Sequence, residues 1–191
     1  QMFERTSINV QVDAVSIIRL SEADFVVDFG TNGAGFSRLT IRGNVPSGAY
    51  VYLAHTEMIS RNGDIFNQFP CSFPAHVCVN QTDTYITAGG SETEVFEPRF
   101  TWHGFCFVKV TGCPAVGFAD GFWWCEVVAL HVGTSFGVSS SLSFKNAPIL
   151  NSIVQAINRT MRSNQLGYQT SCPQREKIAW TGDTQATVLQ Y

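Results

Sequence analysis

The chain has 191 residues and a formal net charge of −3, and 45% of its residues are hydrophobic while 14% are charged. The apolar content suffices for a sizeable core and excludes an intrinsically disordered chain. Without a basic block, the acidic balance argues against a surface for nucleic acid or anionic membrane. The apolar run 122–132 is shorter than the roughly 18 residues of a membrane span and contains Glu126, so it predicts a buried strand.

The low charge content has a second consequence. A typical soluble domain has roughly 25% charged residues, so we expect this chain to have apolar surface that something else covers. This surface would be covered either by a second copy of the chain, in a homo-oligomer, or by further polypeptide of the same protein. Gln1 is not an initiator Met and no signal-peptide pattern is present, so we expect the natural start to lie elsewhere.

Residues 1–140 read as strands separated by turns, with no helical period. Turns are predicted at 30–35, 43–48, 61–64 and 89–90, and the Pro- and Cys-containing stretch 67–79 reads as a loop. Short strands at this spacing favour an antiparallel β-sandwich, jelly-roll-like in form. The predicted strands are 25–29, 38–42, 49–55, 83–87, 105–110 and 122–132.

The pattern changes after residue 140. Asn146 is a suitable cap for a helix with Pro148 in its first turn, and Gly167 is a plausible stop. Thr181 or Asp183 could cap a second helix. Two helices cannot enclose a core of their own, so we expect a β-sandwich domain over 1–140 and the start of a helical domain over 141–191. One face of the first helix is apolar through Ile149, Leu150, Ile153, Val154, Ile157 and Met161.

Six cysteines lie at 71, 78, 106, 113, 125 and 172, without a CxxC pair or a His at metal-ligand spacing, which argues against zinc. Cys71 with Cys78, and Cys106 with Cys113, are close enough in sequence to form disulfides. The even count and the sequons at Asn80 and Asn158 favour a secreted protein. Free buried thiols and chance sequons are the alternative.

The run 171–183 gathers two carboxylates, two cations and an indole, which are the groups that sugar sites use. Glu176 is the candidate general acid, since apolar neighbours can keep a carboxyl protonated near neutral pH. The cations beside it oppose that effect. The alternatives are an ion pair of Glu176 with Lys177 or Arg175, an N-cap role for Asp183, and core packing for Trp180.

Residues 172–176 and 180–183 resemble the signature of the α-L-rhamnosidases, a group of inverting glycoside hydrolases. The resemblance implies that Glu176 is the general acid and that Asp183 binds sugar. It places Trp180 and Arg175 in the segment that forms the pocket. Ser171 stands where the family has an Asp that contacts the sugar, and Ala179 replaces a Gly.

Four earlier blocks are similar to the same family and occur in the same order, at 27–35, 55–58, 81–85 and 97–105. In the family they belong to the β-sandwich before the catalytic barrel. We therefore expect structural rather than catalytic roles for their polar residues, which include Glu57, Asp83, Arg99 and His103.

The resemblance implies a β-sandwich followed by the first one or two helices of an incomplete six-hairpin α/α barrel. Its substrate would be a rhamnose-containing glycan or glycoside, and neither a metal nor an organic cofactor is implied. An inverting mechanism needs a second carboxylate as base, which in the family lies downstream, so we expect this chain to be inactive alone. A non-catalytic carbohydrate-binding or structural β-sandwich module is the alternative.

Overall fold

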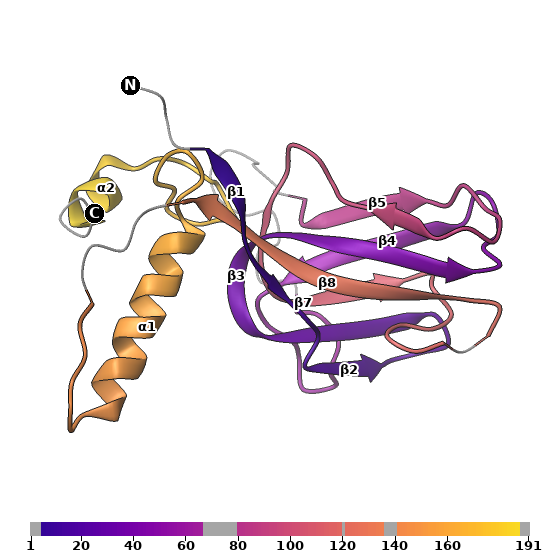
Figure 1. The fold of residues 1–191 in the computed structure, drawn as a ribbon, viewed down its shortest axis with the longest axis horizontal. Helices are drawn as coiled ribbons and strands as arrows, with labels where there is room; N and C mark the ends of the chain where they lie inside the picture. The colour runs from indigo at the N-terminus through magenta and orange to yellow at the C-terminus, as the bar shows by residue number, and fades with distance from the viewer. Residues whose placement is uncertain (1–4, 67–79, 120, 136–140, 188–191) are drawn as a thin grey trace.

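The computed structural model describes residues 5–66, 80–119, 121–135 and 141–187, and the strands lie together at one side of the molecule with the helices at the other (Figure 1). No helix among these residues is long and apolar enough to cross a membrane. The elements in chain order are β1 (Thr6–Val12), β2 (Ser16–Arg19), β3 (Asp24–Gly43), β4 (Tyr50–Thr56), β5 (Thr82–Ile86), β6 (Glu94–Phe96), β7 (His103–Thr111), β8 (Trp123–Thr134), α1 (Pro148–Ser163) and α2 (Thr181–Thr187).

The sandwich is one antiparallel sheet curled on itself around β3. The first part of β3 pairs with β2 and β7, and β7 continues to β4 and β5. The second part pairs with β8 and β6, and β1 lies outside β8. Because β3 belongs to both layers, its bend closes the end of the sandwich that faces α1 (Figure 1). The expected β-sandwich is confirmed.

The bend corrects the prediction of a turn at 30–35 between two strands. These residues lie inside the single 20-residue strand β3, where the register with β7 shifts between Asp28 and Gly33. Gly30 has a φ of +68°, which favours glycine. A Cβ on Gly33 would overlap the His131 ring, and one on Gly35 would overlap the Leu130 carbonyl oxygen. The glycines therefore permit close contact within a strand rather than ending it.

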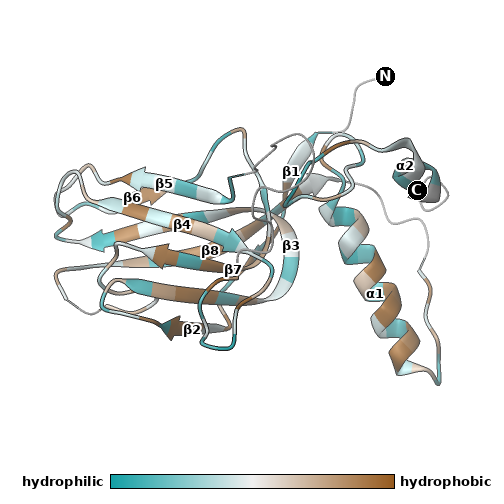
Figure 2. Cartoon of the chain, turned by 180° about the vertical axis from the view of Figure 1, so that it is seen from behind, coloured by the Kyte–Doolittle hydropathy of each residue, from teal (hydrophilic) through white to brown (hydrophobic). Residues whose placement is uncertain are grey.

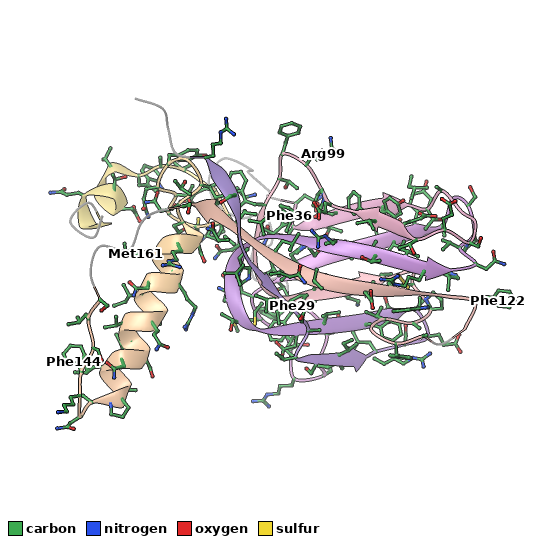
Figure 3. The ribbon with its side chains drawn as sticks, in the orientation of Figure 1. Phe29, Phe36, Arg99, Phe122, Phe144 and Met161 are labelled. Atoms are coloured by element: carbon green, nitrogen blue, oxygen red, sulfur yellow. A yellow bond between two sulfur atoms is a disulfide. The ribbon has the colours of Figure 1, made fainter. Side chains whose placement is uncertain are left out.

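The core fills the space between the two layers. Phe29 lies at the bend of β3 (Figure 3). It packs edge-on against Phe105 of β7 at 5.9 Å between ring centroids, and both are buried. Leu39 and Ile41 of β3 are buried while Thr40 between them is partly exposed, as the two-residue period of a strand requires.

The strands predicted at 49–55, 83–87, 105–110 and 122–132 are confirmed as β4, β5, β7 and β8. The turn at 61–64 is also confirmed, with Gly63 at a φ of +83° and its N–H donated to the Ser60 carbonyl. The loop prediction for 67–79 lies outside the described residues. Strands β1, β2 and β6 were not predicted. β2 and β6 have only four and three residues, which is too short for a periodic signal, whereas Ile8, Val10 and Val12 of β1 do alternate with polar residues and were overlooked.

The predicted disulfide between Cys106 and Cys113 is wrong. Cys113 instead bonds to Cys125 of β8, because the segment after β7 returns alongside β8 and the Cys125 N–H donates to the Ala115 carbonyl. Cys106 is a free thiol 3.8 Å from the Asp28 carboxylate, and burial raises its pKa to about 11. The predicted pair Cys71 and Cys78 lies outside the described residues.

Helix α1 confirms the predicted helix but not its ends. Its N-cap is Ala147 rather than Asn146, with Pro148 in the first turn, and the helix stops before Asn164, short of Gly167. None of its residues is buried, and Ile149 is 68% exposed. The apolar residues of α1 form the brown bands in Figure 2, and no other segment that the structure describes buries them. Tertiary contact with β3 and β8 is limited.

Helix α2 begins at Thr181, so Thr181 and Asp183 lie inside its first turn and the capping prediction for them is wrong. A carboxylate in that turn is favoured by the partial positive charge of the helix N-terminus. Val188 and Leu189 of the predicted helix lie outside the described residues.

Candidate active site

The signature loop, residues 171–180, leads from the turn after α1 to α2. The Ser171 N–H donates to the Ile178 carbonyl at 3.0 Å, which closes the loop on itself. Ser171 and Ile178 are thereby brought side by side although they are seven positions apart in sequence.

The Glu176 carboxylate is hydrogen-bonded to two other side chains of the loop. One of its carboxylate oxygens, Oε1, accepts hydrogen bonds from Trp180 Nε1 at 3.0 Å and from Ser171 Oγ at 3.3 Å. Three of the five predicted site residues are thus in direct contact. The Glu176 side chain is exposed, which leaves its carboxylate accessible from outside the sandwich.

The remaining predicted residues flank this group. Arg175 is exposed directly before Glu176, and Asp183 is exposed in the first turn of α2. Trp180 is 52% exposed, so the alternative that it packs in the core is wrong. Lys177 does not pair with Glu176 but directs its ammonium to Trp102.

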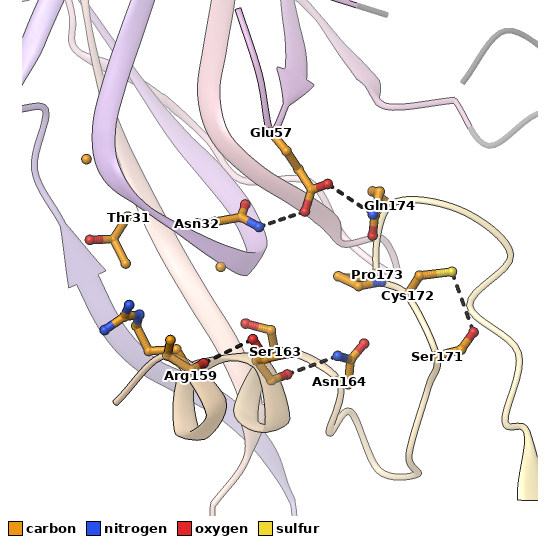
Figure 4. A pocket seen from close by; sticks show the side chains of 14 residues that line it. Thr31, Asn32, Glu57, Arg159, Ser163, Asn164, Ser171, Cys172, Pro173 and Gln174 are labelled. Atoms are coloured by element: carbon orange, nitrogen blue, oxygen red, sulfur yellow. Dashed lines mark hydrogen bonds between the residues drawn. The ribbon is translucent and has the colours of Figure 1, made fainter. Parts of the chain in front are cut away.

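Two contacts attach the front of the loop to the sandwich. Gln174 Nε2 donates to Glu57 Oε2 at 3.0 Å, and the other oxygen of Glu57 accepts from Asn32 Nδ2 at 2.7 Å (Figure 4). Pro173 is buried over Gly104 of β7, where an added Cβ would lie 2.9 Å from the Pro173 Cγ. Glycine therefore lets the loop rest on the strand.

The rear of the loop is attached by Lys177. Its Nζ donates to the Trp102 carbonyl and lies 4.3 Å from the centroid of the Trp102 ring, a cation–π contact. Burial lowers the pKa of this amine, and the charge of Asp83 partly opposes that shift.

A buried polar cluster lies beneath the loop, with the rings of His55 and His103 stacked at 4.1 Å. His55 Nδ1 lies 3.0 Å from the Gln81 carbonyl, an acceptor, so this nitrogen carries the proton and Nε2 accepts from Ser37 Oγ at 2.9 Å. Burial, followed by the charge of His103, lowers the pKa of His55 to about 3.

His103 has oxygen partners on both nitrogens. Its Nε2 contacts Asp83 Oδ2 and its Nδ1 contacts Gln81 Oε1, each at 3.0 Å. The Gln81 amide nitrogen donates to the Gly104 carbonyl, which fixes the amide orientation. Burial would raise the pKa of Asp83, but its hydrogen bond from His103 and the nearby positive charges outweigh burial and lower it.

Donor atoms of His55, Asp83 and His103 lie within 4.8 Å of one another, close enough to be considered for a metal. Every ring nitrogen already has a protein partner, however, so the cluster fits a structural role better than a metal centre. Structural roles were expected from the sequence for Glu57, Asp83 and His103, but their position under the signature loop was not predicted. Their position in the blocks that resemble the family was the available signal.

A cavity of about 360 Å³ lies between the bend of β3, the end of α1 and the front of the loop (Figure 4). Asn32, Glu57, Arg159 and Ser171 are among its lining residues, but Glu176 is not. The cavity therefore belongs to the junction between sandwich and helices rather than to the position where Glu176 could meet a sugar.

Comparison with known proteins assigns this arrangement to a family. Residues 18–132 match the bacterial alpha-L-rhamnosidase concanavalin-like domain. The chain belongs to the bacterial α-L-rhamnosidase family. Residues 140–191 match the family's six-hairpin glycosidase domain, of which α1, the signature loop and α2 are the start.

Curated and solved relatives agree. An alpha-L-rhamnosidase of Streptomyces avermitilis is 35% identical over 83% of this chain, and one of Formosa agariphila is 30% identical over 90%. The structure of alpha-L-rhamnosidase from Dictyoglumus thermophilum superposes with a TM-score of 0.83 at 27% identity, over all of this chain and 20% of the other. The structure of the Streptomyces avermitilis alpha-L-rhamnosidase complexed with L-rhamnose superposes with a TM-score of 0.74 at 30% identity, over 96% of this chain and 16% of the other. This chain spans 14% and 17% of the lengths of the two curated relatives.

Proposed function

We propose that this chain contributes the general acid of an α-L-rhamnosidase that releases terminal α-L-rhamnose from a glycan or glycoside with inversion at the anomeric carbon. The observation that carries the proposal is the exposed Glu176 carboxylate, held by Trp180 and Ser171 within the family's signature loop.

In the proposed reaction, Glu176 donates its proton to the glycosidic oxygen as the bond to the anomeric carbon breaks. A second carboxylate removes a proton from the water that attacks the opposite face of the sugar. The two carboxyl groups of inverting enzymes are roughly 6.5–9.5 Å apart. We infer that the base lies outside residues 1–191, because the curated relatives are several times longer than this chain.

The neighbours of Glu176 include groups that can contact a sugar. The half-exposed indole of Trp180 offers a face for stacking on sugar C–H groups. Arg175 and Asp183 are exposed groups that can hydrogen-bond to sugar hydroxyls. Ser171 gives the carboxylate a neutral donor where the family has an acidic residue.

The test compares two leaving groups in the full-length protein. A p-nitrophenolate leaves readily without a proton, whereas an alkoxide does not, so a general acid matters more for methyl α-L-rhamnoside. We expect Glu176→Gln to lower kcat on the methyl rhamnoside by about 10²–10⁴-fold and on p-nitrophenyl α-L-rhamnoside by less. The matched control, Glu92→Gln, changes an exposed glutamate on the sandwich and should leave both rates unchanged.

Proton NMR of the first product identifies its anomer, which should be β-L-rhamnose for inversion. The isolated 191-residue chain should be inactive on both substrates. Equal losses on the two substrates, full activity of Glu176→Gln, or hydrolysis by the isolated chain would contradict the assignment.

We also infer that the exposed apolar face of α1 is covered in the complete protein by further helices of the six-hairpin domain. The division into a sandwich over 1–140 and a helical domain from 141 remains our interpretation. A secreted location is likewise proposed, and the Cys113–Cys125 disulfide supports it because disulfides persist in oxidising compartments.

A further inference from the structure

Lys177 has an unusual backbone. Its φ is +55°, and Phe100 is the other non-glycine residue with a positive φ among the described residues. This region of φ is unfavourable for a residue with a Cβ, and such a residue persists where the surrounding contacts fix it. Phe100 lies two positions before Trp102 in the sequence, and the Lys177 side chain contacts Trp102. This is the place where the signature loop meets the sandwich.

The contacts of the Lys177 side chain explain what fixes it. The ammonium donates to the Trp102 carbonyl and lies against the face of its ring. The side chain is half-buried, and Asp83 is the charged group that favours its protonated form. Asp83 is itself held by His103. The charge on Lys177 is therefore favoured electrostatically by the buried cluster of the sandwich.

Glu176 and Lys177 are consecutive, yet their side chains have opposite surroundings. The Glu176 carboxylate is exposed and contacts Trp180 and Ser171, whereas the Lys177 ammonium contacts the sandwich. The left-handed turn at Lys177 allows one residue to be anchored while its neighbour faces outward. The proposed mechanism does not use Lys177 in any proton transfer.

We propose that Lys177 is a positioning residue that fixes the general acid, because its ammonium locks the backbone beside Glu176 onto Trp102 of the β-sandwich. This inference rests on the proposed function of Glu176. It gives the sandwich a direct part in placing the catalytic carboxyl, in addition to its own fold.

The kinetic test uses the full-length protein with Lys177→Met, Lys177→Arg and a control, Lys145→Met. A small displacement of a catalytic group costs up to about 10²-fold in rate, so we expect Lys177→Met to lower kcat about ten- to a hundredfold while KM changes less than about twofold. Lys177→Arg keeps a cation that can stack on Trp102 and should recover most of kcat. Lys145 is exposed just before α1, so its variant should match the wild type.

A second readout needs no activity. Trypsin cleavage after Arg175, followed by mass spectrometry, reports whether the loop is anchored, and we expect it to be severalfold faster in Lys177→Met than in Lys145→Met. If the wild type hydrolyses no rhamnoside, the proposed function fails. The trypsin cleavage rates alone then show whether Lys177 anchors the loop to Trp102. Unchanged kcat and cleavage in Lys177→Met, or a loss of kcat that Lys177→Arg does not recover, would overturn the inference.

Discussion

The buried imidazole of His55 should make the sandwich acid-sensitive through one identifiable proton. Burial holds the pKa of His55 at about 3, below the ordinary value of 6.5, so the folded chain keeps the ring neutral while the unfolded chain protonates it. Its contribution is fully present above pH 6.5 and is lost as the pH falls toward 3. One pKa unit corresponds to about 1.36 kcal/mol. Over the first 1.5 units, down to pH 5, the loss is therefore about 2 kcal/mol.

The perturbation that isolates this proton is His55→Gln, whose amide can still meet Ser37 but does not titrate. The assay is urea unfolding of the 191-residue chain, followed by tryptophan fluorescence between pH 7.5 and 5. We expect the free energy of unfolding of the wild type to fall about 2 kcal/mol more than that of the variant over this interval.

Two other titrating groups do not contribute to the difference between wild type and variant over this pH interval. Burial also lowers the pKa of His131, but that ring titrates in both proteins and cancels in the difference. Asp83 has a lowered pKa, so its stabilising effect is lost only at more acidic pH, below the ordinary value of 3.8. Parallel curves for wild type and variant between pH 7.5 and 5 would refute the protonation state assigned to His55.

Two further predictions concern the loop support and the disulfide. Gly104→Val should displace Pro173 from β7, since even a Cβ would lie 2.9 Å from the Pro173 Cγ. Trypsin cleavage after Arg175 should therefore become faster, and an unchanged cleavage rate would argue that this contact does not hold the loop. Replacing both Cys113 and Cys125, which are 12 residues apart, by serine should lower the free energy of unfolding by about 3 kcal/mol in urea titrations, from the entropy of a loop of that length. A loss under about 1 kcal/mol would mean that the bridge restrains the unfolded chain little.

The contacts of the signature loop were only partly predictable. Glu176 and Trp180 were selected from the sequence because a carboxylate and an indole in one short run suit a sugar site. Ser171 was selected because it stands where the family has an Asp that contacts the sugar. The supporting residues were not selected. Glu57 and Gln174 are 117 positions apart, and nothing local in either stretch indicates that their side chains meet.

Local chemistry determined the elements whose signal lies in their own residues. The alternation of residues 38–42 in β3, the turn at Gly63 and the apolar stripe of α1 could be read from the chain, because side-chain direction follows the backbone period. The family motifs likewise determined the choice of Glu176.

Only the tertiary structure decided where distant segments meet. It placed the glycines of 30–35 inside one bent strand, joined Cys113 to Cys125 rather than to Cys106, and directed Lys177 to Trp102 rather than to Glu176. Each of these outcomes depends on which distant segments lie side by side. Sequence proximity does not encode that pairing, because it is set by burying the two faces of the sandwich against each other.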